Sequence, residues 1–123
     1  MRRLPLILAP MLLAASPPQP RKIAIPVEDY PEAAASVGAE GDVGLDLAID
    51  AKGVVTGCTV TAGADLPAGL AGDSCRIVQK NWRFTPALDD AGKKTIGRAS
   101  FTIAWRIIRR CPPTSPTTVC VFL

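Results

Sequence analysis

The residues able to do chemistry are few, and histidine is missing from the 123-residue chain. Its absence excludes Ser-His-Asp and Cys-His nucleophilic sites and any metal site with a histidine ligand. Neither GxxxxGK[ST] nor GxGxxG occurs, so no phosphate-binding loop is indicated. The adjacent carboxylates Glu28-Asp29 and Asp89-Asp90 lie in turn-like segments, where solvated charge is commoner than acid–base catalysis. Composition therefore favours binding over catalysis.

The N-terminus has the layout of an export signal. Arg2 and Arg3 precede the apolar run Leu4 to Ala15, which is shorter than the roughly 20 residues a membrane-spanning helix needs. Residues 1–15 are therefore predicted as a signal peptide, with a short inner-membrane anchor facing the periplasm as the alternative. Residues 16–27 read as a Pro-containing leader, so the expected location is periplasmic.

Four cysteines are the other reactive groups, and export favours disulfides. They stand at positions Cys58, Cys75, Cys111 and Cys120. A four-cysteine zinc site is the alternative, but no CxxC pair supplies the usual ligand spacing. The same absence argues against a thioredoxin-like redox role.

Length and composition indicate one compact domain with a real core, since the chain is 48% hydrophobic and 20% charged. The net charge of +3 falls to +1 when Arg2 and Arg3 are removed with the signal. So small a charge does not suggest a nucleic-acid partner.

Alternating hydrophobicity predicts a β-hairpin. Gly41 to Asp50 places Val43, Leu45, Leu47 and Ile49 on one face. After a turn at Asp50 to Gly53, the strand Val54 to Thr61 is expected to place Val54, Cys58 and Val60 on one face.

A main helix and a long strand follow. Asp73 or Ser74 can cap a helix through about Trp82 after a loose connection over residues 63–72. Its apolar stripe contains Cys75, which would face Cys58 on the inner face of the sheet and close a disulfide loop. The run Ile96 to Ile108 then alternates again as a strand with a strong apolar face.

The predicted fold is α+β, a three-stranded antiparallel sheet packed against one main helix plus a short N-terminal helix within residues 28–37. The domain is expected over 28–108, with a tail over 109–123 that Cys111 and Cys120 staple into a loop. Val121, Phe122 and Leu123 would pack back or pair with another edge. Trp82, Phe84 and Trp105 are expected in the core, whereas the charged neighbours of Tyr30 suggest an exposed ring, with a packing role as the alternative.

This pattern resembles the C-terminal domain of the TonB family of periplasmic energy transducers. The resemblance covers roughly residues 28–108 and rests on the order and spacing of short segments. They are Tyr30-Pro31, Glu40-Gly41-Asp42-Val43, Ile49 to Val54 (IDAKGV) and Asn81 to Ala87 (NWRFTPA). The cysteines at 58 and 75 look like a variant seen in part of that family.

The resemblance implies a binding module, with no enzyme activity, cofactor or metal. Family members bind the TonB box, an extended segment of outer-membrane receptors, by β-augmentation along the last strand. The strand at Ile96 to Ile107 suits this role if it lies at the sheet edge, because it has no proline and few outward charges. The expected partner-binding residues are Tyr30, Pro31, Ile96, Arg98, Ser100, Thr102, Ala104 and Arg106.

The chain also departs from the family pattern. A full transducer carries a transmembrane helix with a Ser/His signature and a long Pro-rich spacer, whereas this chain has no histidine and only the stub SPPQP. We therefore expect a module that does not itself use the proton gradient. The alternative is a self-pairing periplasmic structural or adaptor protein that forms a homodimer through its edge strands.

Overall fold

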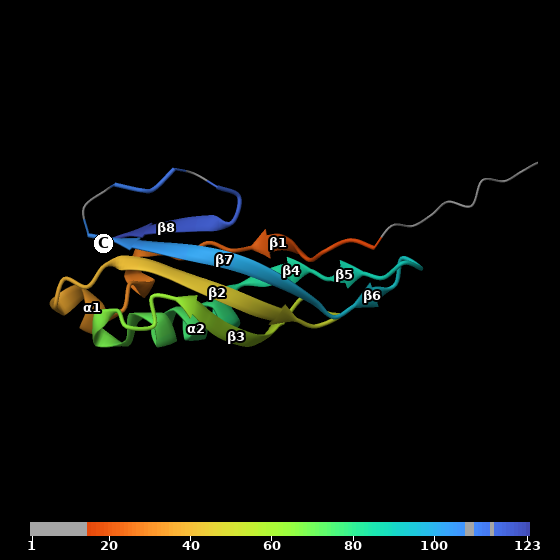
Figure 1. Ribbon diagram of the computed structural model, residues 1–123, viewed down its shortest axis with the longest axis horizontal. Helices are drawn as coiled ribbons and strands as arrows, with labels where there is room; N and C mark the ends of the chain where they lie inside the picture. The colour runs from red at the N-terminus through yellow and green to blue at the C-terminus, as the bar shows by residue number, and fades with distance from the viewer. Residues whose placement is uncertain (1–14, 108–109, 114) are drawn as a thin grey trace, which may run out of the picture.

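The computed structural model describes residues 15–107, 110–113 and 115–123. Its main sheet has four strands in the order β3-β2-β7-β8 (Figure 1). These are β2 (Gly41–Ile49), β3 (Val55–Ala62), β7 (Gly97–Arg106) and β8 (Thr118–Phe122). The three antiparallel strands β2, β3 and β7 match the predicted sheet, but the prediction of three strands was incomplete. The C-terminal tail adds β8, which runs parallel to β7.

The hairpin β2–β3 forms where the alternation predicts it. Val43, Leu45, Leu47 and Ile49 are buried on one face of β2. The predicted face of β3 is wrong at its start, because a register irregularity near Ile49 turns Val55 into the core instead of Val54.

The turn of this hairpin is held by one carboxylate. Asp50 Oδ1 accepts hydrogen bonds from the backbone amides of Lys52 at 2.8 Å and Val54 at 3.0 Å. The Val54 amide is the main reason that the pKa of Asp50 lies below its ordinary value. Gly53 completes the turn with a φ of 83°, a conformation that favours glycine.

The main helix α2 (Leu70–Asn81) starts earlier than predicted. A short turn, η2 (Pro67–Gly69), leads into it, and residues 70–72 of the expected loose connection are already helical. Ser74 consequently lies inside the helix rather than at its cap. The early start is favourable because it buries Leu70 and Ala71.

The short N-terminal helix is confirmed. The segment consists of η1 (Val27–Asp29) and α1 (Glu32–Ser36), and Gly38 with a φ of 66° follows the end of α1. Pro31 precedes the first helical residue, where a missing N–H costs nothing.

Aromatic rings join these elements in the core. Trp82, Phe84 and Phe101 form edge-on contacts, with ring centroids 5.2 Å apart for Trp82–Phe101 and 5.7 Å for Phe84–Phe101. Trp105 is also fully buried. The predicted core role of Trp82, Phe84 and Trp105 is confirmed.

The leader is paired rather than merely extended. Its strand β1 (Gln19–Lys22) pairs antiparallel with β4 (Arg83–Thr85), and Ser16 exchanges backbone hydrogen bonds with Leu88 of β5 (Ala87–Leu88). A small hairpin joins β5 to β6 (Lys94–Thr95). The predicted signal peptide falls almost entirely on residues 1–14, outside the described residues. Within the described ranges, no helix is long and apolar enough to cross a membrane.

Candidate functional site

The edge of β7 opposite β2 was expected to be free along the whole strand, and the structure corrects this. Strand β8 pairs with β7 from Thr102 to Arg106. The Thr102 amide donates to the Thr117 carbonyl at 2.8 Å, and the Leu123 amide donates to the Arg106 carbonyl at 2.9 Å. The chain's own tail therefore covers the C-terminal half of the edge.

The N-terminal half of the same edge, Gly97 to Phe101, is called the open edge below. No other strand of the described residues pairs with it. The bonds of Thr102 and Arg106 show that even-numbered residues of β7 direct their backbone groups away from β2. The register with β2 is unbroken, so the same alternation directs the N–H and C=O of Arg98 and Ser100 into the open edge.

A groove of about 290 Å³ runs along the open edge. One wall is the proline-rich leader and the other is the part of the tail just before β8. Its lining residues are Pro17, Pro18, Gln19, Pro20, Arg98, Ala99, Ser100, Phe101, Pro116 and Thr117. Prolines have no N–H, so they flank the open edge without donating to it. Ile96, which directly precedes β7, is 77% exposed.

The side chains of β7 on the solvent face are bound to β2. The Ser100 hydroxyl donates to Asp46 Oδ1 at 2.8 Å, and Arg98 forms an ion pair with Asp46 at 3.4 Å. These cross-strand contacts hold two of the expected partner-binding side chains on the sheet. What the open edge offers to a partner is therefore mainly its backbone.

The remaining expected residues of β7 lie under the tail. Arg106 forms an ion pair with Asp42 at 2.6 Å. Ala104 is fully buried and pairs with Cys120 of β8, while Thr102 pairs with Thr118. Thr102, Ala104 and Arg106 therefore have their outward backbone side occupied by the chain itself.

Tyr30 is not exposed, and that expectation was wrong. Its ring is 5% exposed and packs edge-on against Trp105, and its hydroxyl donates to the Ala39 carbonyl at 2.6 Å. Burial raises the pKa of this hydroxyl above its ordinary value of 10, and the Glu40 carboxylate raises it further. The contacts describe a packing role, which was the stated alternative.

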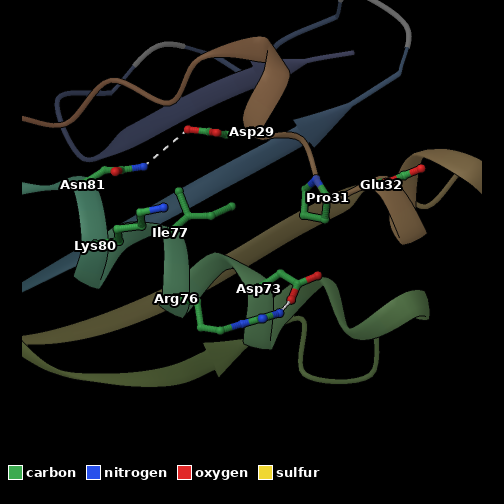
Figure 2. Close-up of a pocket in the computed structure, with 8 residues that line it drawn as sticks. All are labelled: Asp29, Pro31, Glu32, Asp73, Arg76, Ile77, Lys80 and Asn81. Carbon is green, nitrogen blue, oxygen red and sulfur yellow. Dashed lines mark hydrogen bonds and ion pairs between the residues drawn. The ribbon is translucent and has the colours of Figure 1, made fainter.

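Pro31 lies elsewhere, at a second hollow between α1 and α2 (Figure 2). This hollow has a volume of about 400 Å³ and carries charges of both signs. Two of its three acidic groups have partners of their own, because Asp73 forms an ion pair with Arg76 and Asp29 accepts a hydrogen bond from Asn81 at 3.4 Å. The structure therefore separates Pro31 from the edge of β7.

Both predicted disulfides are formed. Cys58 on β3 is bonded to Cys75 on α2, with their Cα atoms 5.6 Å apart. Cys111 is bonded to Cys120 on β8, with their Cα atoms 5.9 Å apart. All four thiols are thus used in disulfides, and the described residues contain no cluster of three or more metal-ligating side chains.

The sequence profile of the family described as Gram-negative bacterial TonB protein C-terminal matches residues 26–107. The chain belongs to this TonB C-terminal family. The match covers the two helices and strands β2 to β7 but ends before β8. Neither a search of curated proteins nor a search of solved structures gave a significant match.

The TonB C-terminal family consists of periplasmic domains that act in transport through protein–protein interaction, with receptors of the outer membrane as the implied partners. It is not known as a family of enzymes. Within this domain, the open edge and its groove are the features that suit an extended partner.

One part of the site was missed from the sequence, and another, the pairing of the tail with a sheet edge, was predicted only as one of two alternatives. The proline walls of the groove come from segments that were interpreted as a leader and a tail. The pairing of β8 with β7 had a weak signal, since Val119 and Val121 alternate with Thr118, Cys120 and Phe122 over only five residues. So short a run predicts a strand but not its neighbour.

Proposed function

We propose that this protein is an exported TonB C-terminal-like module that binds an extended segment, the TonB box, of an outer-membrane receptor. The segment adds to the sheet at the open edge of β7. The observation that carries the proposal is the row of outward backbone groups at Arg98 and Ser100 along a groove. Main-chain pairing of this kind needs only an extended partner backbone.

The location of the groove supports the same partner class. Its lining places proline side chains beside the open edge, and the neighbouring carboxylate Asp46 already forms an ion pair with Arg98. Recognition therefore relies on strand pairing and on contacts with apolar side chains such as Ile96, rather than on a strong charge.

A proline substitution tests this function directly. Ser100→Pro removes an outward N–H that does not pair with β2, so we expect binding of a TonB-box peptide to weaken at least tenfold. Ser100→Ala removes only the hydroxyl and keeps the amide, so it should bind as the unmodified protein does. Both variants need the native dispersion of core amide signals before titration.

Equal binding by the two variants, or no preference for the box peptide over a scrambled one, would contradict the proposal. A peptide-binding titration by fluorescence anisotropy supplies both comparisons.

The second candidate is self-pairing through the outer edge of β8. It is favoured by apolar groups beside that edge, where Val27 is 55% exposed and Leu123 is 49% exposed. A hollow of about 250 Å³ lies between them and includes Ile25 and Phe122. Light scattering at high concentration distinguishes it: a dimer mass supports self-pairing, and a monomer mass excludes it.

A further inference from the structure

The tail strand competes for the surface that a partner would use. Strand β8 takes the outward backbone groups of Thr102 and Arg106, which continue the row formed by Arg98 and Ser100. The open edge spans five residues, or about 17 Å, whereas the whole of β7 would offer about twice that length. A partner strand longer than the open edge would therefore meet the start of β8.

Few buried side chains pack β8 against the domain. Val121 is 2% exposed and Val119 is partly buried against the core. Thr118, Cys120 and Phe122 are only half-buried. Strands with so little buried surface open locally at a small fraction of the global stability.

The Cys111–Cys120 disulfide stabilises the docked position of β8, because it shortens the covalent path that connects the end of β7 to β8. Cys111 follows Arg106 by only five residues, whereas Cys120 follows it by fourteen. With the disulfide, the middle of β8 is tied to the end of β7 through the shorter path. Loop-closure scaling with the 3/2 power of length predicts that this raises the ratio of docked to undocked β8 about fivefold.

We propose that the Cys111–Cys120 disulfide sets the length of β7 that a partner can pair with, by holding β8 on the edge as an intramolecular competitor. This inference rests on the proposed function for the identity of the partner, but not for the behaviour of β8. With the disulfide intact, pairing is confined to Gly97 to Phe101. Without the disulfide, the partner displaces β8 and its pairing with β7 extends to Arg106.

Amide hydrogen exchange tests the competitor without any partner. By the alternation along β7, the amides of Thr102 and Ala104 face β8, while those of Ile103 and Trp105 face β2. In the variant C111A/C120A, we expect exchange at Thr102 and Ala104 to become about fivefold faster relative to Ile103 and Trp105. Unchanged relative exchange at these two amides would overturn the proposal.

The matched control is C58A/C75A, which removes the other disulfide and leaves the tail stapled. Its effect should be a general loss of stability, which raises exchange at Ile103 and Trp105 because these amides need the larger opening, and which does not accelerate Thr102 and Ala104 relative to them. A selective increase at Thr102 and Ala104 in this control would also overturn the proposal, because the effect would then not belong to the tail disulfide.

Titration with a synthetic TonB-box peptide connects the two proposals. We expect C111A/C120A to bind the peptide about fivefold more tightly, with chemical-shift changes that extend from Gly97 to Arg106. Binding that stays confined to the open edge in this variant would contradict the inference. If the peptide binds neither protein while Thr102 and Ala104 exchange faster, the proposed function fails and the competing role of β8 stands.

Discussion

At the scale of single residues, Ser74 shows how a polar group is accommodated in the core. It is fully buried, and its hydroxyl both donates to the Leu70 carbonyl at 2.7 Å and accepts from the Trp105 indole N–H at 2.9 Å. The sequence offered a helix cap for this serine, and a cap would have been exposed. Its contact with Trp105 lies 31 positions away along the chain, which local sequence patterns do not encode.

Replacing this serine tests the value of the buried hydrogen bond. Ser74→Ala leaves the Trp105 N–H buried without an acceptor, so we expect the free energy of unfolding to fall by about 1–3 kcal/mol. Ser100→Ala is the control, since that hydroxyl is exposed and its loss should change stability by less than about 0.5 kcal/mol. Urea unfolding measures both, and equal losses would contradict this account of the core.

Tyr30 provides a second test, because it is the chain's one tyrosine. Burial raises its pKa above 10 in the folded protein, so the unfolded chain loses the phenol proton first as the pH rises. The contribution of this group to stability is therefore complete below pH 10 and is lost as the pH rises through the folded pKa. An absorbance titration of tyrosinate should show folded protein titrating above the urea-unfolded chain. Coincident curves would contradict the burial.

At the scale of elements, strands with a long run of alternating hydrophobicity were predicted, and the shortest strands were not. Nine residues of alternation in β2 and ten in β7 determine which face is buried, because a shift of one residue would expose every apolar side chain. The three residues of β4 and the four of β1 carry no such pattern. Their pairing depends on tertiary contacts of the leader with the segment after α2.

The same reasoning explains the missed half of the candidate site. The strand β7 was predicted, but with its outer edge free along its whole length, whereas the limits of the open edge are set by β8 and by prolines far away in the chain. The predicted buried face of β3 was wrong at the start of the strand for a local reason. A bulge near Ile49 reverses which side chains face the core, and such a bulge leaves no signal in composition.

The turn of the hairpin gives a prediction at this scale. Gly53 has a positive φ, and a Cβ there would collide with the Phe84 carbonyl, so Gly53→Ala should destabilise the protein by at least about 1–3 kcal/mol. Gly72 lies in α2 with open space around it, so Gly72→Ala should instead stabilise by about 0.5–1 kcal/mol. Thermal unfolding of the pair should give shifts of opposite sign, and shifts of the same sign would contradict the prediction.

At the scale of the whole molecule, segments from both ends of the described chain meet at the open edge. The leader forms one wall of the groove and the tail residues just before β8 form the other, beside a domain that matches the family over residues 26–107. The two flanking segments thus leave a short part of β7 accessible. Function in this account depends on how these segments restrict an otherwise long sheet edge.

The most direct test of this account is an amide NMR titration of the oxidised protein with a TonB-box peptide. We predict shifts concentrated on Gly97 to Phe101, strongest at Arg98 and Ser100, with Thr102 to Arg106 still paired to β8. No shifts at saturating peptide, or shifts confined to β3 or to the hollow between α1 and α2, would contradict the claim that the open edge of β7 is the partner-binding surface.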